Sequence, residues 1–348
     1  MALGQESNAQ FESRKRDHIR LALSEKNQAL GNSGLERLAL MHEALPELAF
    51  HEIRLSHNSL GKKQRTPFLV SSMTAGHADS VNLNRLLAKA CAARGWRMGV
   101  GSQRRELGDA EAAREWKSIR KAAPGVDLLG NLGLAQIIHS KTSVIEKLVE
   151  GLEASAMIVH LNPLQECLQP EGTPDFRGGM KALKNLVKAL KVPVIVKETG
   201  CGFSKPTLKK LKGLKLGAVD VSGLGGTHWG RIEGDRADGV RRMAAEALAD
   251  WGISTVESVE NAVKVKPDYE IWASGGVRTG VDAAKLLAMG ASAVGLAKPI
   301  LEAALKSERD LLLKMETIEF ELKTALFCTG AKSILDLQKK KAWQWRAE

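Results

Sequence analysis

Short apolar segments recur along the whole chain, and each is followed by glycine or polar residues and then by a helical pattern. The segments are rich in Val, Ile and Leu and alternate little between apolar and polar positions. Such near-continuous hydrophobicity is typical of strands covered on both faces, and hence of a parallel sheet. The predicted strands span residues 66–73, 97–102, 127–133, 156–162, 193–198, 218–223, 270–276 and 293–298.

The segments between the predicted strands carry apolar residues at helical spacing, as in SVNLNRLLAKACAARG and GVDAAKLLAMGA. Eight strand-then-helix units without a break favour a (β/α)8 TIM barrel over a doubly wound α/β sheet. A chain of 348 residues fits one such barrel. We therefore predict a single structural domain with a mostly helical arm or lid at 1–65 and a catalytic barrel at 66–348, whose last segment, 333–348, lies on the surface.

The formal net charge of +11 raises the question of an anionic partner. Much of the excess lies in KALKNLVKALK (181–191) and KPTLKKLKGLKLG (205–217), where lysines recur between apolar residues at helical spacing. Such lysines are typical of the solvated face of an amphipathic helix. Nucleic-acid binding would require interleaved aromatic residues or a recognisable reading motif, and neither is present. A small phosphorylated substrate agrees with the charge.

Targeting and redox signals are also absent from the sequence. No apolar run approaches the length that crosses a bilayer, and the first twenty residues lack the apolar core of a signal peptide. The four cysteines are scattered and form no CxxC pair, which argues against a disulfide framework or a zinc site. These features predict a cytoplasmic protein with no membrane or nucleic-acid partner.

Two glycine-containing loops give the strongest chemical signal. In a barrel, the reactive face lies at the carboxyl ends of the strands, where SGGVRTG (274–280) and GLAKP (295–299) follow the last two predicted strands. Gly275 and Gly276 remove the Cβ atom at a turn, and the helix that follows would offer free N–H groups to a phosphate. Glycine could instead serve the turn geometry alone, but the second loop favours a phosphate-bearing cofactor or substrate.

Lys197 ends PVIVKE, a strand that is otherwise apolar. Because lysine is seldom buried without a partner, it either pairs with Glu198 or faces an anionic ligand. Beside a flavin ring it would stabilise the negative charge of the reduced form. The stretch SGLGGTHWGRIEGDR then places the hydroxyls of Ser222 and Thr227 around a glycine-rich bend, which is either part of the site or a flexible loop.

HLNPLQE (160–166) places an imidazole, carboxamides and a carboxylate directly after a predicted buried strand. It is either an ordinary capped turn or a set of side chains directed into the pocket. Glu166 suits Mg²⁺, which keeps several waters and shares diphosphate oxygens. Gln165 does not titrate near neutral pH, so its role would be hydrogen bonding. His160 would either exchange protons or be structural.

The N-terminal arm carries a basic run of its own. Arg14, Lys15 and Arg16 precede a helical pattern in SRKRDHIRLAL. The run is either a solvated basic surface or a segment that folds over the barrel mouth and grips a diphosphate.

Together and in this order, the motifs resemble the type 2, FMN-dependent isopentenyl-diphosphate delta-isomerase family. HLNPLQE followed by QPEG is the most specific piece, and one position departs from the family pattern, where MTGG is usual and this chain has Met73-Thr74-Ala75-Gly76. The matching pieces run from about residue 14 to residue 300 and are RKRDH, SSMT, GSQR, the Asn of GNLG, HLNPLQE with QPEG, PVIVKE, SGLGGTHW with IE, and SGGVRTG with GLAKP.

The resemblance assigns roles to individual residues. It implies that Gln165, with His160 and Asn162, is catalytic, and that Glu166 binds Mg²⁺. The substrate diphosphate would be bound by Arg14, Lys15, Ser102, Gln103 and Arg104, and Gln165 would lie over the substrate alkene. FMN would contact Met73, Thr74, Ala75, Ser102, Asn131, Lys197, Ser222 and Thr227, with its phosphate end at Gly275, Gly276, Val277, Arg278, Ala297 and Lys298.

The reaction that the resemblance implies is the interconversion of isopentenyl and dimethylallyl diphosphate in isoprenoid biosynthesis. The flavin must be reduced, by NAD(P)H in related enzymes, although the isomerisation itself is redox-neutral. The reduced ring would add a proton to the alkene and remove another from the adjacent carbon, and the arm would exclude water as a lid. Members of the family form homo-oligomers, tetramers or larger.

Two other interpretations remain open from the sequence. An FMN-dependent 2-hydroxyacid oxidase or dehydrogenase would use a similar barrel, with His228 as base and Arg278 as carboxylate ligand, although THWGRIE follows Gly226 where that chemistry wants a His beside the glycine pair. A non-catalytic phosphate- or nucleic-acid-binding protein would be colourless and bind in a strongly salt-dependent way. An isomerase with FMN would be yellow.

Overall fold

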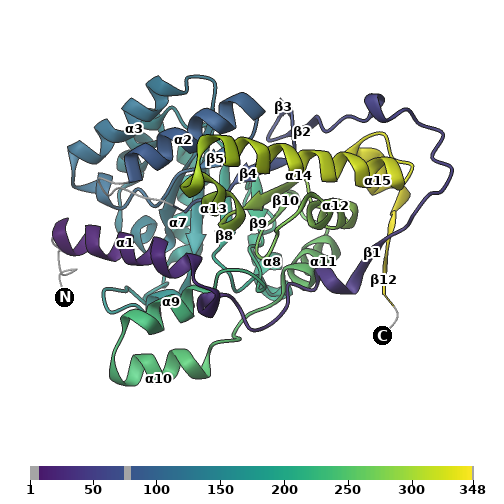
Figure 1. Ribbon diagram of the computed structural model, residues 1–348. Coiled ribbons are helices and arrows are strands. Elements are labelled where there is room, and N and C mark those ends of the chain that lie inside the picture. The colour runs from purple at the N-terminus through teal and green to yellow at the C-terminus, as the bar shows by residue number, and fades with distance from the viewer. Residues whose placement is uncertain (1–7, 74–79, 347–348) are drawn as a thin grey trace.

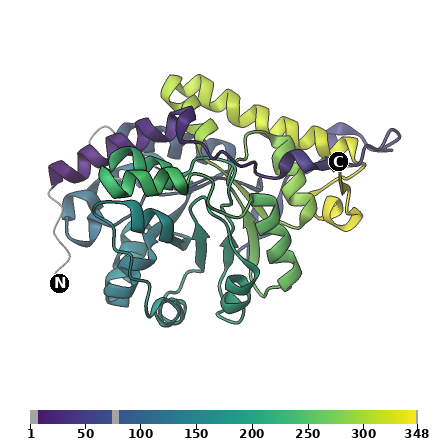
Figure 2. The same ribbon diagram turned by 90° about the horizontal axis from the view of Figure 1, so that it is seen from below.

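The computed structural model describes residues 8–73 and 80–346, except for the side chains of residues 8–13, Lys15 and Ala110. Eight parallel strands close into a barrel in the order β10-β11-β4-β5-β6-β7-β8-β9, which confirms the predicted fold (Figures 1 and 2). Each strand lies within a segment that the hydrophobic pattern predicts. The strands are β4 Phe68–Val70, β5 Arg97–Gly99, β6 Asp127–Gly133, β7 Ala156–Leu161, β8 Val194–Glu198, β9 Ala218–Asp220, β10 Glu270–Ala273 and β11 Ala293–Leu296.

Helices surround the barrel and bury their apolar faces against its outer surface (Figure 2). In α7, Leu183 and Leu186 are buried while Lys181, Lys184 and Lys188 are exposed, which confirms the solvated-face interpretation of this lysine-rich stretch. The helices after the arm are α2 Ser80–Arg94, α3 Ala110–Ala122, α4 Leu134–His139, α5 Thr142–Leu152, α6 Pro163–Leu168, α7 Gly179–Ala189, α8 Lys205–Leu211, α9 Trp229–Arg236, α10 Gly239–Ala247, α11 Thr255–Val265, α12 Gly280–Met289, α13 Lys298–Lys306, α14 Glu308–Cys328 and α15 Ile334–Lys340.

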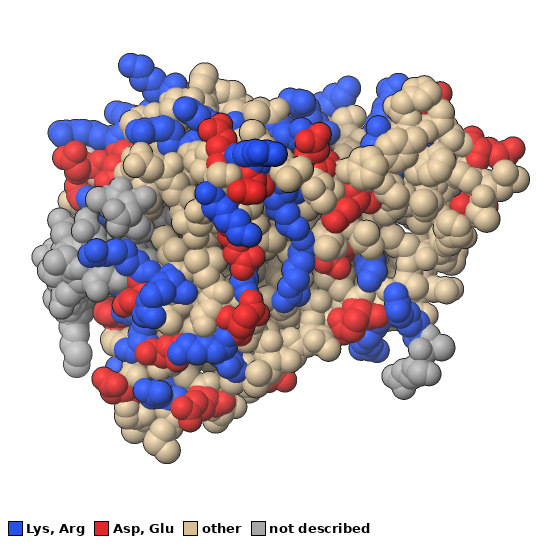
Figure 3. Space-filling view, in the orientation of Figure 1, with Lys and Arg blue, Asp and Glu red and all other residues tan. Residues whose placement is uncertain are grey.

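The surface shows the same mixture of charges. On the face in Figure 3, Lys and Arg are interspersed with Asp and Glu instead of forming one continuous basic patch. In the described ranges 8–73 and 80–346, no helix combines the length and the apolar character that a bilayer span requires.

The interior of the barrel is closed at its amino end. Trp272 is fully buried there, and its Nε1–H donates to Glu270 at 2.9 Å. Glu270 also accepts hydrogen bonds from the Ser59 hydroxyl and the Leu60 N–H, both at 2.6 Å, and thereby fixes the hairpin of β2 His57–Ser59 and β3 Lys62–Gln64. A cavity inside the barrel is therefore left to the carboxyl end, where the predicted site residues lie.

The N-terminal arm contains less helix than its sequence pattern predicts. It forms α1 Asn8–Leu23 and the 3-10 turns Glu25–Asn27, Leu35–Arg37 and Phe50–Glu52, joined by extended segments. Helix α1 packs against α9 and α13 (Figure 1), both of which follow carboxyl ends of barrel strands. The arm therefore reaches the mouth of the barrel.

The described part of segment 333–348 lies on the surface, as predicted, but one of its faces is anchored to the rest of the fold. Ile334 and Leu337 of α15 are buried, and β12 Trp343–Trp345 pairs antiparallel with β1 Leu38–Leu40 of the arm. The pairing explains why this short, lysine-rich end carries two tryptophans. The arm and the C-terminal segment are thus joined, and Figure 1 shows β1 in purple beside β12 in yellow.

Replacing Gly280 with Ala is expected to lower the free energy of unfolding by about 1–3 kcal/mol, because the added methyl would overpack a tight contact. Gly280 begins α12, and a Cβ atom there would collide with the backbone of Ile318 and Leu322 in α14. Urea unfolding would measure the change. As a control, Gly151 in α5 has open space around the added Cβ, so Gly151→Ala is expected to stabilise by about 0.5–1 kcal/mol. Equal effects at both positions would contradict the packing argument.

Candidate active site

Two adjoining cavities lie at the carboxyl ends of the strands, with volumes of about 740 Å³ and 100 Å³. They share a wall to which the arm, the ends of strands β4 and β8, and α9 contribute. A ligand in one cavity would therefore lie beside a ligand in the other. The shared residues are His18, Ser72, Met73, Lys197, Thr199 and Trp229.

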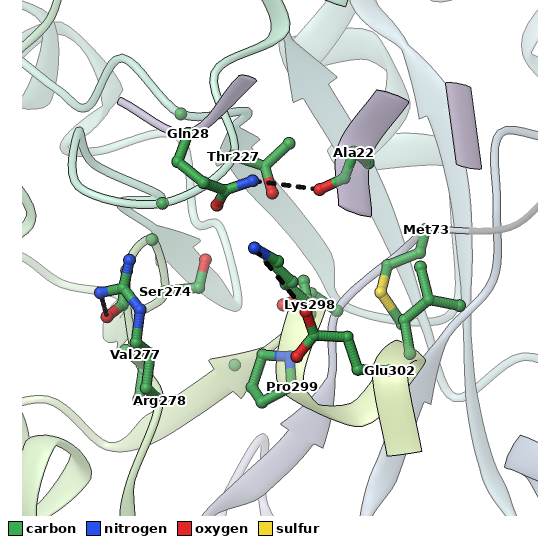
Figure 4. Close-up of a pocket in the computed structure, with 18 of the residues that line it drawn as sticks. Ala22, Gln28, Met73, Thr227, Ser274, Val277, Arg278, Lys298, Pro299 and Glu302 are labelled. Atoms are coloured by element: carbon green, nitrogen blue, oxygen red, sulfur yellow. Dashed lines mark hydrogen bonds and ion pairs between the residues drawn. The ribbon is translucent and has the colours of Figure 1, made fainter. Parts of the chain in front are cut away.

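The larger cavity contains most of the residues predicted to bind FMN. Ser102 and Asn131 line the smaller cavity instead, and Thr74 and Ala75 lie outside the described residues. Predicted residues that line the larger cavity are Met73, Lys197, Ser222, Thr227, Gly275, Gly276, Val277, Arg278, Ala297 and Lys298 (Figure 4).

The glycine-rich loop has a backbone conformation that suits glycine. Gly275 and Gly276 have φ angles of 99° and 73°, in the left-handed region that side chains with Cβ avoid. A Cβ atom at either residue would also collide with the backbone of Gly223 or Gly225. These glycines allow the loops after β9 and β10 to pack closely at one end of the cavity.

The predicted free N–H groups at the start of α12 are not found. Thr279 and Asp282 form a capping box, and the Asp282 carboxylate accepts the N–H groups of Arg278 and Thr279 at 3.0 and 3.1 Å. The Gly280 N–H donates to Glu321. The start of α12 is thus capped by the protein itself. The start of α13 at Ala297 and Lys298, which also lines the cavity, has no side-chain cap, so it and the neighbouring charged side chains are left to attract a phosphate.

Two cations are placed for that role. The Arg278 guanidinium lies over the loop and donates to the Gly276 carbonyl at 3.1 Å. The Lys298 ammonium forms an ion pair with Glu25 of the arm and lies 3.7 Å from Glu302 (Figure 4). Its hydrogen bond and charge lower the pKa of Glu25. An anion in the cavity would find both cations within the lining.

Lys197 pairs with a residue that the sequence interpretation did not consider. Its Nζ lies 3.0 Å from an Asp220 carboxylate oxygen and donates to the Ser274 hydroxyl at 3.0 Å. The adjacent Glu198 accepts backbone N–H groups from Thr199 to Gly202 instead. Lys197 and Glu198 are consecutive residues of a strand, so their side chains point to opposite faces.

Buried hydroxyl groups indicate that the larger cavity is shaped for a polar ligand. In the described part of the chain, the Ser71 and Ser72 hydroxyls are buried and have no hydrogen-bond partner, and both residues line this cavity. Buried polar groups are normally satisfied, so such hydroxyls call for a ligand or water. The hydroxyls, the two cations and Lys197 fit a flavin with a phosphate tail.

The smaller cavity brings together residues that are far apart in the sequence. Gln103 is an exception, because it is fully buried, its carboxamide is bonded to Glu106 and to the Asn131 N–H, and it lines neither cavity. The Lys15 side chain is outside the described residues. Predicted residues that line this cavity are Arg14, Ser102, Arg104, Asn131, His160, Asn162, Gln165 and Glu166.

The side chains of HLNPLQE are ordered by one another. Asn162 donates from Nδ2 to Gln165 and to Glu166, at 3.0 Å each, and Glu166 also accepts the Thr173 N–H at 2.6 Å. The His160 ring lies 2.9 Å from the Asn131 carboxamide oxygen. Of the two interpretations of this stretch, the structure supports a set of side chains that line a cavity.

Glu233 is a central residue of the site that the sequence interpretation left without a role. It is fully buried and lies 2.8 Å from Gln165 Nε2, 3.0 Å from His18 of the arm and 2.5 Å from Arg236. Burial alone would raise the pKa of Glu233, but His18 and Arg236 outweigh it and hold the pKa at about 2. A carboxylate only accepts hydrogen bonds, so Gln165 must turn its NH₂ group toward Glu233.

The metal prediction rests on a single carboxylate. Among the residues that the structure describes, no three His, Cys, Asp or Glu side chains cluster as a metal site. Glu166 is buried beside the smaller cavity, and each of its oxygens accepts one hydrogen bond and retains a lone pair. This donor set fits Mg²⁺ shared with a bound diphosphate better than a cage made only of protein ligands.

The arm is joined to the site through its backbone. Gln28 forms an antiparallel bridge with Thr227, the Ala29 N–H donates to Gly226 at 2.7 Å, and the His228 N–H donates to Asn27 at 2.9 Å. Gln28 also donates from its side chain to the Ala22 carbonyl at the cavity wall (Figure 4). The arm therefore covers the barrel mouth as an ordered part of the site.

Known proteins resemble this chain in sequence over nearly its whole length. The profile of the FMN-dependent dehydrogenase family matches residues 168–344. An isopentenyl-diphosphate delta-isomerase of Legionella pneumophila (strain Corby) is 54% identical over 338 residues, covering 97% of this chain and 99% of that protein. One of Bdellovibrio bacteriovorus is 52% identical over 345 residues, with the same coverage of each chain.

Solved structures show the same fold at much lower sequence identity. A flavocytochrome b2 mutant with benzoylformate has a TM-score of 0.69 at 18% identity and covers 94% of this chain and 82% of its own. A mandelate oxidase mutant with an FMN adduct has a TM-score of 0.65 at 14% identity and covers 100% and 98%. The relatives of high identity decide the assignment: the chain belongs to the type 2, FMN-dependent family of isopentenyl-diphosphate delta-isomerases.

Proposed function

We propose that the two cavities divide the work of an isopentenyl-diphosphate delta-isomerase, with FMN in the larger and the diphosphate substrate in the smaller. One observation carries this proposal: Lys197 and Met73 lie on the wall that both cavities share. A flavin ring beside Lys197 would therefore face the substrate cavity, while its phosphate would extend toward Arg278 and Lys298.

Reduced FMN supplies a group that can give a proton to the substrate alkene and accept one from the neighbouring carbon. The residues of the protein bind the cofactor and the substrate, orient them toward each other and exclude water from the site. Lys197 places a positive charge beside the ring, where it stabilises the anionic reduced form. We propose the remaining FMN contacts, including Thr74, Ala75, Ser102 and Asn131, as the sequence predicts them.

The substrate side combines cations with carboxamides. Arg14, Lys15 and Arg104, together with the Ser102 hydroxyl, are proposed to bind the diphosphate, since charged donors bind phosphate oxygens strongly. Gln103 would act from outside the cavity by fixing the loop that carries Arg104. Gln165, aligned by Glu233, would contact the alkene, with His160 and Asn162 beside it.

Exclusion of water falls to the arm, which we propose to act as a lid. A tertiary cation that develops during isomerisation would be captured by water, so a closed site is needed. His18 lines both cavities and is held by Glu233, and the pairing of Gln28 with Thr227 fixes the arm on the other side. Binding of the diphosphate by Arg14 would close the arm over the substrate.

Glu166→Gln is expected to raise the Mg²⁺ concentration for half-maximal turnover by about tenfold or more, because a neutral amide replaces a charged metal ligand. FMN binding should be unchanged. Turnover measured over a series of Mg²⁺ concentrations would show the effect. Glu150→Gln, an exposed substitution at the end of α5, serves as the control. An unaltered Mg²⁺ dependence in Glu166→Gln would remove this residue from the metal site.

We extend the proposal to NAD(P)H as the electron source, to a cytoplasmic location and to a homo-oligomer of four or more chains. Four cysteines without disulfide bonds agree with a reducing compartment. The side chains of Val240, Met243 and Trp251 around α10 are 83%, 72% and 61% exposed, which agrees with a contact between copies of the chain.

The hydroxyacid oxidase alternative finds little support at its expected base. His228 is buried as the N-cap of α9, where its ring accepts the Arg231 N–H at 3.2 Å and contacts the Trp251 carbonyl at 3.2 Å, and it lines neither cavity. The two activities can be separated directly. The purified protein should be yellow and, once reduced under anaerobic conditions, should exchange substrate protons in heavy water, and it should not oxidise 2-hydroxyacids. A colourless protein that does not retain added FMN would overturn the proposal.

A further inference from the structure

A buried ion pair lies at the wall of the larger cavity, which Lys197 lines. Lys197 and Asp220 have side chains that are 8% and 2% exposed, with Nζ and Oδ2 3.0 Å apart. Ser274 connects them a second time, since its hydroxyl accepts from Lys197 at 3.0 Å and donates to Asp220 Oδ1 at 2.7 Å. The Ser222 N–H donates to the same Oδ1 at 3.3 Å. These contacts together hold the carboxylate in one place.

The position of the pair follows from strand register. Lys197 of β8 lies directly opposite Asp220 of β9, so the two side chains emerge on the same face of the sheet. A buried pair is weak evidence for stability, because desolvation of two charges offsets most of their attraction. Its location on the cavity wall points to a function in the site.

We propose that Asp220 is a positioning residue that keeps the Lys197 amine protonated and directed at the flavin in both redox states. The proposal rests on the placement of FMN in the larger cavity. Without its carboxylate partner, a buried ammonium favours the neutral form, because burial penalises the charge. The positive charge that stabilises the anionic reduced ring would then have to be acquired during reduction.

Other charged groups around Lys197 are engaged elsewhere. Glu198, on the same strand, accepts four backbone N–H groups. His160 of β7 lies opposite Lys197 in register, and its ring contacts the Asn131 oxygen at 2.9 Å. His18 from α1 lines the same cavities and is bonded to Glu233. Among the described residues, Asp220 is thus the carboxylate that forms an ion pair with Lys197.

Asp220→Asn with FMN bound tests the proposal through proton counting. Reduction of the bound flavin takes two electrons from the reductant and protons from water. In the wild-type protein these protons go to the flavin alone, whereas in Asp220→Asn the neutral Lys197 amine should take up one more. The equilibrium constant for reduction of the flavin should therefore change by an additional factor of ten per pH unit. For a two-electron couple, this makes the pH dependence of the midpoint potential steeper by about 30 mV per pH unit. Anaerobic titration with an indicator dye between pH 6 and 9 measures this slope.

Three variants separate this role from a structural one. Asp127→Asn breaks the partly buried Arg97–Asp127 pair at the amino end of the barrel and should keep the wild-type slope. Lys197→Arg/Asp220→Asn should restore the wild-type slope, since arginine stays protonated in proteins. Ser274→Ala leaves both charges in place and should also keep the slope.

A wild-type slope in Asp220→Asn with FMN bound would overturn the inference and leave the proposed function intact. A steeper slope in Ser274→Ala would also overturn it, even if Asp220→Asn did not retain FMN, because the carboxylate is still present there. Failure of the wild-type protein to bind FMN would instead contradict the proposed function itself.

Discussion

Replacing Gln165 with Asn is expected to lower turnover by about 10²-fold, the cost of moving a site group by about 1 Å, while the bound flavin is retained. The shorter side chain withdraws its carboxamide from Glu233, which now holds it at 2.8 Å, and from the smaller cavity. Because the amide does not titrate, the loss should be nearly independent of pH between 6 and 8. Proton exchange in heavy water with reduced enzyme would measure turnover, and the flavin absorbance would report binding.

Gln338→Asn provides a matched control for that experiment. Gln338 of α15 donates to the Ala291 carbonyl at 2.9 Å. Neither residue lines either cavity. The same chemical change there should leave turnover within a factor of about two, since it removes at most one neutral hydrogen bond. Unchanged turnover in Gln165→Asn, with FMN bound, would exclude contact of this residue with the reacting alkene.

The barrel could be predicted because the features that define it are local. Strands covered on both faces have an almost unbroken apolar pattern, and all eight carry it. The carboxyl ends of parallel strands lie at one end of a barrel, so His160, Lys197 and Gly275 could be assigned to one site without knowledge of the coordinates. Neither inference required strand register or side-chain conformation.

The partners of the site residues depended on register and on packing between distant segments. Asp220 is Lys197's partner because β8 and β9 pair in one particular register, which the apolar pattern does not specify. The sequence did contain a signal against Glu198 as the partner of Lys197. Consecutive residues of a strand point to opposite faces, so these two side chains could not pair. The role of Glu233 could be recognised only from the packing of α1 on α9, because this packing brings His18 and Glu233 together from distant parts of the sequence.

The phosphate end shows a signal that was present and missed. Thr279-Gly-Val-Asp282 has the spacing of a capping box, which consumes the very N–H groups that a phosphate would use. The antiparallel pairing of β1 with β12 had no comparable signal, because three-residue strands carry too few positions to show a period. The helix α12 was predicted correctly, but the expectation of free N–H groups at its start was an error of interpretation. The pairing of the arm with the C-terminal segment was beyond a pattern-based prediction.

Glu233→Gln is expected to reduce both stability and turnover, because Glu233 is fully buried and is the partner of both Arg236 and His18. Removing one partner of a buried pair costs about 3–5 kcal/mol, since the remaining charge stays desolvated. Arg236 and His18 would each lose their charged acceptor here. Release of His18 should loosen the arm, so limited proteolysis near α1 should accelerate at temperatures where the barrel is still folded.

The same residue should govern the acid limit of stability. The pKa of Glu233 falls from an ordinary value of 4.5 to about 2 in the folded protein, so the unfolded state binds its proton first as the pH drops. The stabilisation, about 3 kcal/mol for a shift of this size, is therefore complete above pH 4.5 and disappears between pH 4.5 and 2. Urea unfolding at pH 7 and in this acid range should show a loss in the wild-type protein that is smaller in Glu233→Gln.

Glu171→Gln separates this effect from a general dependence on Arg236. Glu171 binds the same guanidinium at 3.0 Å, but its side chain is 33% exposed whereas that of Glu233 is fully buried. Water can replace the lost partner at Glu171, so its substitution should cost less than about 1 kcal/mol and leave the arm protected. Equal losses in the two variants would mean that the arm is held by the charge of Arg236 and not by Glu233, and Gln165 would then need another explanation for its orientation.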